Sequence, residues 1–459
     1  MFIGREKELS TLEKLYSSDS FEFAVIYGRR RVGKTTLISN FCKDKESIFF
    51  VAEEFDNEFN LRKFTEVVLE KYKENYIDKF TDWLKAFKYI ASKAKNERLI
   101  LVIDEFPYIA KANRTLMSIL QNIIDHEFLE TKIMLILCGS AMSFMENKVL
   151  GYKSPLFGRR TAQMQIKPFN FYEASRFLEN YSINDRIITY SILGGVPQYL
   201  LKFDYKKSVK ENIISNILDT SAYLYEEPIN LLKQEMRQPA LYNSIISAIA
   251  GGYSKLNEIA TKISATTDKT ATYLKNLQEL RIITRVTPIM EKDNSRKSIY
   301  KLNDNLFKFY YKFVVNNVNL IEQGNTKYVY DKIKDELNGY VSYIYEDICI
   351  DYLIELNKKQ ENPFMIEQIG KWWGGNPKTK KQEEIDIVGI GNESMIFGEC
   401  KYRNEKVDIE VVEDLIRKSE IFGCDDKYYY VFSRSGFTKR VEDYARENER
   451  VRLIWDQEI

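Results

Sequence analysis

Histidine is nearly absent from this sequence. His126 is the single histidine among 459 residues. This scarcity excludes zinc fingers of the Cys/His type, His-rich metal sites and reactions that need several histidine bases. Any metal site in the chain must therefore use carboxylates, which favour hard cations such as Mg²⁺.

Cysteine is also scarce, and its spacing shows no pattern. The five cysteines are odd in number and never form a CxxC pair. A disulfide framework and a zinc ribbon are therefore not expected. We expect buried, reduced thiols at all five positions: Cys42, Cys138, Cys349, Cys400 and Cys424.

Long hydrophobic runs and an excess of charge are missing too. No apolar run approaches the roughly 20 residues of a membrane-spanning helix, and the first residues, MFIGREKEL, lack the segments of a signal peptide. The sequence therefore predicts a cytoplasmic protein without a membrane partner. Its net charge is +1, so a nucleic-acid partner would need a local basic face.

The residues that are present predict a folded protein of several domains. Hydrophobic residues make up 44% of the chain and aromatic residues 14%, which is enough for ordinary globular cores. A length of 459 residues exceeds that of one typical domain. We therefore expect about two to four domains.

The order of apolar and amphipathic segments predicts a multidomain α/β fold. In residues 1–170, short apolar runs alternate with helix-length segments, which is typical of a parallel sheet covered on both faces. Residues 171–237 are predicted to form a helical lid. In residues 238–318, three helical patterns precede a hairpin, the order of a winged helix-turn-helix. Residues 335–459 are predicted to form a separate α/β domain.

Local patterns predict individual elements within these domains. In the lid, residues 171–181 and residues 208–225 each predict one helix. A polar turn at residues 291–297 is expected to join the two strands of the hairpin. In the last domain, a leading helix is predicted at 342–356, and strands at 365–373, 384–390, 395–402 and 428–433.

Residues 28–35 carry a phosphate-binding motif. They fit GxxxxGK[ST] and lie between the apolar run FAVIY and the helical pattern TTLISNF, which is the context the motif requires. Backbone N–H groups of such a loop point at phosphates, while Lys34 reaches the β and γ oxygens and Thr35 ligates magnesium. The sequence therefore predicts binding of ATP with Mg²⁺ by Gly28, Arg29, Arg30, Arg31, Val32, Gly33, Lys34, Thr35 and Thr36.

A second motif agrees with the first. Residues 98–103 are apolar after an initial arginine and lead into the adjacent carboxylates Asp104 and Glu105. Asp104 is expected to hold Mg²⁺, and Glu105 is expected to polarise the water that attacks the γ-phosphate. Hydrolysis of ATP, and not binding alone, is therefore predicted.

Two further polar positions are candidates for catalysis. The strand that ends at Gly139 is expected beside the strand of Asp104, so Ser140 either senses the γ-phosphate or only caps the next segment of the chain. Arg159 or Arg160 is either an arginine finger that reaches a phosphate across the cleft or from a neighbouring subunit, or an ordinary surface arginine. An arginine supplied by a neighbour would make the protein a homo-oligomer.

Six segments in this order resemble the archaeal ATPase family: FIGREKEL, GRRRVGKTTL, LILVIDEFPY, LILCGSAMSFM, SPLFGRR and LGGVPQYL. That family belongs to the AAA+ and STAND-like P-loop proteins and is related to origin-recognition ATPases. The resemblance covers residues 2–235 and implies that Phe2, Ile3 and Arg5 line the adenine pocket. One departure is LGGVP, which stands where many AAA+ proteins have a sensor arginine.

The hairpin-containing segment has a local excess of basic residues. Residues 240–301 contain ten Lys or Arg against five Asp or Glu. In its last helix, Leu274, Leu277 and Leu280 form the inward stripe. Lys269, Thr272, Lys275 and Asn276 are then available on outward faces. This face either binds DNA or serves only for packing and protein contacts.

The C-terminal domain places three ionisable groups in one predicted hairpin. Side chains alternate along a strand, so Glu399 and Lys401 share a face and Cys400 points the other way. If residues 392–393 form a two-residue loop, Asp386 lies across from Glu399, within about 5 Å at Cβ. Asp386 and Glu399 would then hold Mg²⁺ or Mn²⁺, and Lys401 would position the attacking water.

This arrangement resembles the D-x(n)-E-x-K signature of the PD-(D/E)xK nuclease superfamily, which the C-terminal domain family that accompanies archaeal ATPases shares. The resemblance covers residues 335–459 and implies a further metal ligand on the preceding helix. Glu346 is the candidate, although it could equally lie on the solvated side of that helix.

Two hypotheses of function arise from these motifs. In the first, the nucleotide state controls a DNA-directed, magnesium-dependent C-terminal module. In the second, the protein is an ATP-driven signalling or scaffolding switch, and its C-terminal domain is an inactive module for protein contacts.

Overall fold

The computed structural model describes residues 2–74, 79–236, 238–292 and 295–459. The chain divides into two units. The first comprises Met1–Pro168 with Val196–Gln198, and the second comprises Phe169–Gly195 with Tyr199–Ile459. Most residues of the predicted lid belong to the second unit.

The first unit contains a five-stranded parallel sheet, as the alternating pattern predicted. Its order is β2-β3-β4-β1-β5. β4 therefore lies between the strand that precedes the phosphate-binding motif and the strand that ends at Asp104, and the predicted pairing of β3 with β4 is confirmed. The strands are β1 (Glu22–Tyr27), β2 (Ser47–Val51), β3 (Leu99–Asp104), β4 (Ile133–Gly139) and β5 (Ala162–Gln165).

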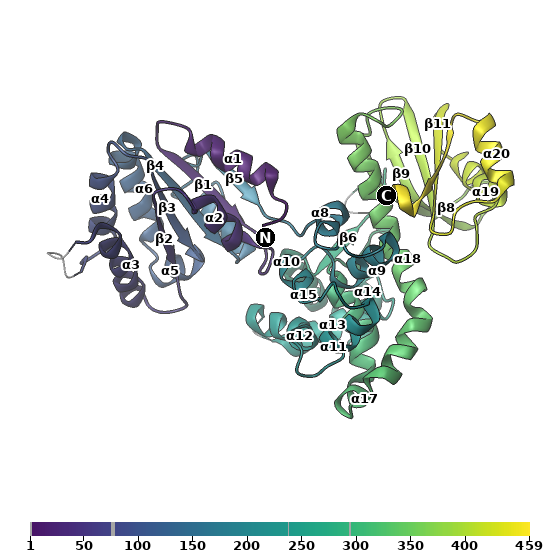
Figure 1. Cartoon of the computed structure of the whole chain (residues 1–459), viewed down its shortest axis with the longest axis horizontal. Helices are drawn as coiled ribbons and strands as arrows, with labels where there is room; N and C mark the ends of the chain where they lie inside the picture. Colours follow the sequence, from purple (N-terminus) through teal and green to yellow (C-terminus); the bar gives the residue numbers. More distant parts are fainter. Residues whose placement is uncertain (1, 75–78, 237, 293–294) are drawn as a thin grey trace. The chain divides into compact units, whose positions relative to one another are not determined.

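Helices cover both faces of this sheet, because alternate residues of each central strand are buried on opposite sides (Figure 1). α1 (Glu6–Tyr16) and α2 (Lys34–Cys42) pack on one face. The opposite face is covered by α3 (Asn57–Tyr72), α4 (Trp83–Lys93), α5 (Phe106–Ala112) and α6 (Leu116–His126).

The second unit begins with short helices that correct the predicted lid. Residues 171–181 form only α8 (Phe171–Ser175), followed by turns. Residues 208–225 do not form one helix either, because α11 (Val209–Asn216) ends before α12 (Tyr223–Glu235). Asp219 interrupts them, since its side chain accepts hydrogen bonds from the backbone N–H and the hydroxyl of Ser221 at 2.8 and 2.7 Å. α9 (Ile183–Leu193) lies between α8 and α11.

Three helices and a two-stranded antiparallel sheet follow, in the order that the sequence predicted. The helices are α13 (Pro239–Ala250), α14 (Leu256–Lys262) and α15 (Thr267–Glu279), and the strands are β6 (Ile283–Val286) and β7 (Ile299–Leu302). The predicted turn at residues 291–297 includes residues 293–294, which lie outside the described ranges.

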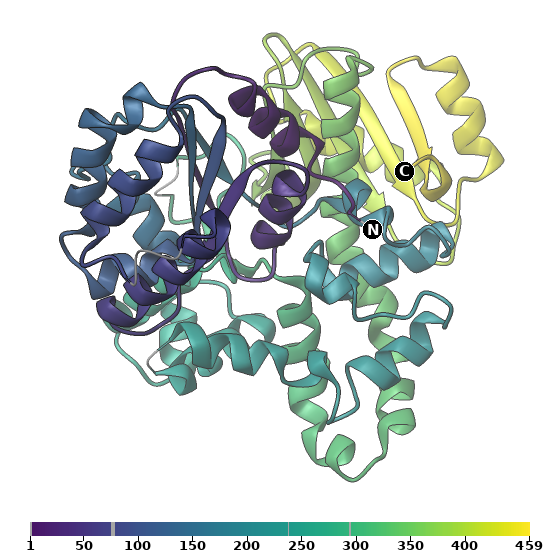
Figure 2. The ribbon, with the colours of Figure 1, turned by 60° about the vertical axis from the view of Figure 1, so that its left-hand side comes forward.

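α18 (Thr326–Lys359) is longer than the helix that the sequence predicted. It contains 34 residues, so the predicted domain start at residue 335 falls inside it. Buried side chains recur along it from Val329 to Leu353. It contacts α9 and α11 as well as two strands of the C-terminal sheet, and both views show only its last part beside that sheet (Figures 1 and 2). The prediction was short because Gly339 and the charged residues around it interrupt the apolar pattern.

The C-terminal sheet has the order β12-β11-β10-β9-β8. β8, β9 and β10 pair antiparallel, whereas β10, β11 and β12 pair parallel. α19 (Ile409–Ser419) and α20 (Lys439–Glu447) pack on one face. α20 and β12 were not predicted. The strands are β8 (Gln368–Gly375), β9 (Gln382–Ile390), β10 (Ser394–Lys401), β11 (Asp426–Ser433) and β12 (Val451–Trp455).

The cysteines and the apolar helices can be compared with what the sequence predicted. All five cysteines are free, with Cys42, Cys138 and Cys349 buried and the other two half-buried. None of the described helices combines the length and the apolar character that crossing a bilayer requires.

Asp351 of α18 makes the stability of the second unit depend on pH. Its carboxylate accepts a hydrogen bond from the Phe171 backbone N–H at 3.3 Å. Burial raises the pKa of Asp351 to about 6, and the nearby charges of Asp347 and Glu355 add to this effect. A raised carboxyl pKa means that the stability present at low pH is lost as the pH rises from about 4 to about 6.

Asp351→Asn is therefore expected to stabilise the protein at pH 8 by up to about 3 kcal/mol, since the amide oxygen still accepts the hydrogen bond without a buried charge. The gain should vanish below about pH 4. Denaturant unfolding of the full chain at several pH values measures it. Asp331→Asn, at an exposed position of the same helix, is the control. A gain that does not change with pH would contradict the assignment.

Candidate functional site

The phosphate-binding motif forms the turn between β1 and α2. Gly33 caps α2 with φ 86°, a left-handed conformation that glycine adopts without strain. At Gly28 a Cβ atom would lie 2.3 Å from the carbonyl oxygen of Ile166, so a side chain does not fit there. Lys34 is buried, and its Nζ donates to the carbonyl oxygen of Arg29 at 3.1 Å. Both glycines of the motif thus stand where a residue with a side chain would be strained or would not fit.

The two predicted magnesium ligands of this unit lie together. The hydroxyl of Thr35 donates to Oδ2 of Asp104 at 2.6 Å. Asp104 is 1% exposed, so its buried carboxylate is stabilised by hydrogen bonds from the protein. The Thr35 hydroxyl donates to Oδ2, and the Glu105 backbone N–H donates to Oδ1 at 2.8 Å. The structure therefore brings a hydroxyl and a carboxylate, both hard oxygen ligands, to the end of the phosphate-binding loop.

Glu105 and Ser140 also meet, as neighbours at the ends of β3 and β4. Glu105 adopts φ 50° at the start of α5, an uncommon conformation for a residue with a side chain. Its Oε2 accepts hydrogen bonds from the Ser140 hydroxyl at 2.8 Å and the Ser140 backbone N–H at 3.3 Å. The contact fixes the direction of the carboxylate. Strained backbone of this kind occurs most often at functional sites.

Arg5, in the N-terminal segment, is hydrogen-bonded to the phosphate-binding loop. Its guanidinium donates to the carbonyl oxygens of Val32 at 3.0 Å and Lys167 at 2.7 Å, and it is 5% exposed. Phe2 packs against the core beneath α1 and α2, and Ile3 is half-buried. The segment that the resemblance assigned to the adenine pocket therefore contacts the loop through Arg5.

Arg159 is engaged by a carboxylate of its own unit. Its guanidinium donates to both oxygens of Asp125 in α6, at 2.7 and 2.6 Å, and this hydrogen bonding lowers the pKa of Asp125. The guanidinium of Arg160 stacks over the ring of Phe157, 5.5 Å from its centroid. Arg159 would have to leave Asp125 before it could reach a phosphate.

The basic face of α15 is only partly as predicted. Lys269, Thr272 and Lys275 are exposed. Asn276 corrects the prediction, because it is half-buried and donates its amide to the hydroxyl of Tyr242 at 2.7 Å. Of the predicted inward leucines, Leu274 and Leu277 are buried and Leu280 is half-buried.

The C-terminal hairpin has the register that the sequence predicted. β9 and β10 pair up to Gly398 with Ile387, so Glu399 and Asp386 are the next pair. The Gly391 backbone N–H donates to the Ser394 carbonyl at 3.0 Å, which leaves residues 392–393 as a two-residue loop. The Asp386 carboxylate accepts a hydrogen bond from the Cys400 backbone N–H at 2.9 Å.

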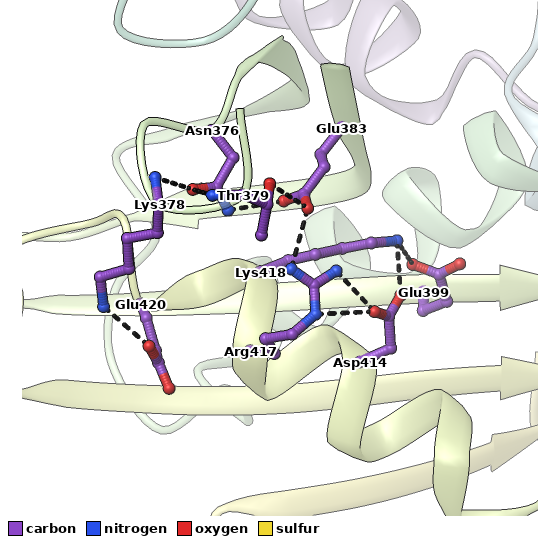
Figure 3. A network of polar contacts seen from close by, with 9 residues as sticks. All are labelled: Asn376, Lys378, Thr379, Glu383, Glu399, Asp414, Arg417, Lys418 and Glu420. Atoms are coloured by element: carbon purple, nitrogen blue, oxygen red, sulfur yellow. Dashed lines mark hydrogen bonds and ion pairs between the residues drawn. The ribbon is translucent and has the colours of Figure 1, made fainter. Parts of the chain in front are cut away.

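Two lysines neutralise Glu399. Lys401 donates to its Oε1 at 2.5 Å. Lys418 of α19 lies 3.7 Å from its Oε2 and 3.1 Å from Asp414, and Figure 3 shows Lys418 reaching across to both acids. Within the described part of the chain, Oε2 of Glu399 accepts no hydrogen bond, although Glu399 is only 8% exposed. That oxygen is buried in the protein, and the Lys418 ammonium, 3.7 Å away, is the cation paired with it.

Burial and neighbouring acids disfavour the ionised form of Asp386. Burial raises its pKa to about 7, and the charges of Glu399 and Glu346 raise it further, against the opposing effect of Lys401. The three acids therefore repel one another when all are ionised. An added divalent cation would relieve that repulsion.

Glu346 lies on the sheet side of α18 and not on a solvated side. Its side chain is 20% exposed and pairs with Lys371 of β8 at 2.6 Å. Burial raises the pKa of Glu346 against the lowering effect of Lys371. Among the described residues, however, no three His, Cys, Asp or Glu side chains converge closely enough to hold a metal ion as they stand.

Two lysines of this site were missed by the sequence analysis. Lys418 follows Asp414 by four residues in an amphipathic helix, a spacing that indicates only a surface ion pair. Lys371 lies in the aromatic strand segment IGKWWGG, where a single lysine in an otherwise uncharged run is the signal that could have identified it.

Comparisons with known proteins match two separate parts of the chain. A family model described as an ATPase domain predominantly from Archaea matches residues 2–203. A second model, of archaeal and bacterial proteins of unknown function, matches residues 310–412. Protein MJECL04 of Methanocaldococcus jannaschii is 35% identical over 445 residues, which are 95% of this chain and 96% of that protein.

Other similar proteins cover less of the chain or are more distant. The ATP-binding protein MJ1659 of the same organism is 24% identical over 266 residues, with 46% of this chain and 73% of that protein covered. The solved Walker-type ATPase PABY2304 of Pyrococcus abyssi shares 20% identity with a TM-score of 0.49, covering 68% of this chain and 96% of its own.

Proposed function

The chain belongs to the family of ATPases found predominantly in Archaea, and on that premise we propose that its first unit binds ATP with Mg²⁺ and hydrolyses it. The observation that supports this most is the pairing of Thr35 with Asp104 beside the pairing of Glu105 with Ser140, all at one edge of the sheet. Release of phosphate from ATP by the purified chain, in the presence of Mg²⁺, tests it.

The groups of this site have separate roles in the proposed reaction. Residues 28–36 supply backbone N–H groups and the Lys34 ammonium to the phosphates. A bound Mg²⁺, held by Thr35 and Asp104, would neutralise phosphate charge. Glu105 orients the attacking water, and Ser140 holds Glu105 until the γ-phosphate arrives. Phe2, Ile3 and Arg5 border the adenine, and Arg159 is the candidate arginine from a second copy.

The second unit is proposed to bind DNA through a winged helix. α13, α14, α15 and the β6–β7 sheet have the order of that fold. Exposed Lys269 and Lys275 lie on α15, the helix that would enter the major groove. The basic excess of this segment within a nearly neutral chain supports a contact with phosphates.

Lys269→Glu combined with Lys275→Glu is expected to weaken binding to duplex DNA, because two phosphate contacts are replaced by repulsion. The slope of log affinity against log salt should become shallower by about 2. Fluorescence anisotropy at several salt concentrations measures both quantities. The control is Lys332→Glu with Lys334→Glu, which makes the same charge change at exposed positions of α18. Equal affinity and slope in the α15 variant would place DNA binding elsewhere.

The C-terminal sheet is proposed to carry a metal-dependent nuclease site of the PD-(D/E)xK type. Asp386, Glu399 and Glu346 are the metal-binding side chains in this proposal. The mutual repulsion of these acids and the buried Glu399 oxygen without a hydrogen bond fit Mg²⁺ or Mn²⁺. A divalent cation there would polarise a phosphodiester, and Lys401 would position the attacking water.

A second candidate is supported by a different observation. Lys401 already pairs with Glu399, and Lys371 with Glu346, so cations of the chain itself neutralise two of the three acids. The C-terminal sheet would then be an inactive module for protein contacts, and ATP would drive assembly or release of a partner. Cleavage of DNA by wild type, absent in Asp386→Ala, separates the two candidates.

A further inference from the structure

Lys371 is an ion-pair partner at the edge of the C-terminal sheet. Its ammonium lies 2.6 Å from Glu346 and 2.9 Å from Asp347, and its side chain is 12% exposed. Burial by itself lowers the pKa of Lys371, but the charges of Asp347 and Glu346 outweigh this effect and raise it. The lysine is therefore a fixed cation between two acids of α18.

An irregularity in the pairing of β8 with β9 lies at Lys371. Gly370 pairs with Val388, but Trp372 pairs with Ile385, so two residues of β9, Asp386 and Ile387, stand opposite Lys371 along the strands. Such a bulge redirects side chains and occurs often next to functional sites. Glu346, the partner of Lys371, is also one of the acids whose charge acts on Asp386.

We propose that Lys371 is an internal counter-ion that occupies Glu346 and keeps a divalent cation out of the C-terminal carboxylate site until β8 moves. This inference rests on the metal site proposed above and names its regulation. A single ammonium satisfies the charge of Glu346, so a metal ion gains that ligand only after Lys371 has left it.

Ile289 and Lys297, which lie between β6 and β7, contact β8 at and beside Lys371. The Ile289 backbone N–H donates to the Lys371 carbonyl oxygen at 2.9 Å, and the Ile289 side chain packs on the C-terminal core. On the same strand, Nε1 of Trp373 donates to the Lys297 carbonyl at 3.1 Å. The hairpin of the proposed winged helix and the counter-ion are thus joined through β8. DNA that draws this connection away would loosen Lys371.

Departure of Lys371 would not leave the acids of α18 without any cation. Lys301 of β7 and Lys308 of α16 (Asn305–Phe309) also act electrostatically on Asp347. Both acids therefore retain positive charge nearby, since Lys301 also acts on Glu346, but Glu346 loses its direct ion pair.

Titration of Mn²⁺ into the full-length protein, followed by electron paramagnetic resonance, tests the proposal. The relevant binding is the part lost in Asp386→Ala. Lys371→Met is expected to bind Mn²⁺ at least about tenfold more tightly than wild type. Lys371→Arg keeps the charge and should match wild type. Lys378→Met removes an exposed lysine that lies between β8 and β9 and pairs with Glu420. This control variant should also match wild type.

A second variant applies if Lys371→Met fails to fold. Glu291 N–H donates to the Pro288 carbonyl at 3.1 Å, and Met290 has φ 71°, so Ile289 occupies the position of a turn that accepts proline. Ile289→Pro removes the N–H that holds Lys371 and should also tighten Mn²⁺ binding.

The outcomes separate this inference from the proposed function. If Asp386-dependent binding is present and equal in wild type, Lys371→Met and Ile289→Pro, the counter-ion role is wrong and the metal site stands. If none of these proteins shows Asp386-dependent binding, the metal site itself is wrong, and the counter-ion role fails with it.

Discussion

ATP turnover is expected to fall by at least about 100-fold when Glu105 is replaced by glutamine, because a positioned carboxylate contributes on that order to proton transfer and water orientation. The Kd for ATP should change by less than about twofold, since residues 28–36, and not Glu105, are the proposed phosphate contacts. The amide of glutamine can still accept a hydrogen bond from Ser140, so the local structure is retained.

Phosphate release and equilibrium binding of a slowly hydrolysed ATP analogue measure the two quantities separately. Glu130→Gln, at an exposed position of the same unit, is the matched control and should behave as wild type. Wild-type turnover by Glu105→Gln would contradict the role of Glu105. Parallel loss of binding and turnover would instead give Glu105 a structural role.

DNA cleavage is expected to fall by at least about 100-fold in Asp386→Ala, together with loss of divalent-ion binding, because a metal-dependent mechanism requires the ion that Asp386 would hold. Glu399→Ala should behave in the same way. Lys401→Ala should differ, since lysine is not a metal ligand: the ion still binds while cleavage falls. ATP hydrolysis should be unchanged in all three, because these residues belong to the second unit.

Cleavage assays with Mg²⁺ or Mn²⁺, with and without ATP, and calorimetry of metal binding measure these effects. Asp425→Ala changes an exposed aspartate of the same domain and is the control. Cleavage that persists in Asp386→Ala would exclude this site as its source. A wild-type protein that neither cleaves nor binds a divalent ion through Asp386 would favour the module for protein contacts.

Much of the fold was predictable where the signal is local. The strands β1, β3 and β4 are continuous apolar runs because both faces of a parallel sheet are covered. The register of β9 with β10 followed from loop length and side-chain alternation, and the structure has that register. Motif spacing likewise predicts that Asp104 and Thr35 lie together, and the two side chains are hydrogen-bonded.

The contacts that the sequence missed depend on partners distant in the chain. The ion pair of Arg159 with Asp125 joins residues that are 34 positions apart in the sequence. The ion pair of Lys371 with Glu346 joins residues that are 25 positions apart. Neither ion pair produces a pattern of neighbouring residues in the sequence from which it could be predicted. Asn276 was placed outward by helical periodicity, but Tyr242 of another helix holds it inward. Polar side chains are the hardest to place, because their positions are decided by tertiary contacts and not by propensity.

Binding of ATP with Mg²⁺ to wild type and to Lys34→Ala is the most direct test of the ATPase assignment. Lys34 supplies the ammonium of the phosphate-binding loop, and in the structure it is buried against the Arg29 carbonyl. Wild type is expected to bind ATP tightly in calorimetry, whereas Lys34→Ala is expected to lose tight binding with no change in thermal stability without nucleotide. Equal affinity of the two proteins for ATP, or no binding by wild type, would contradict it.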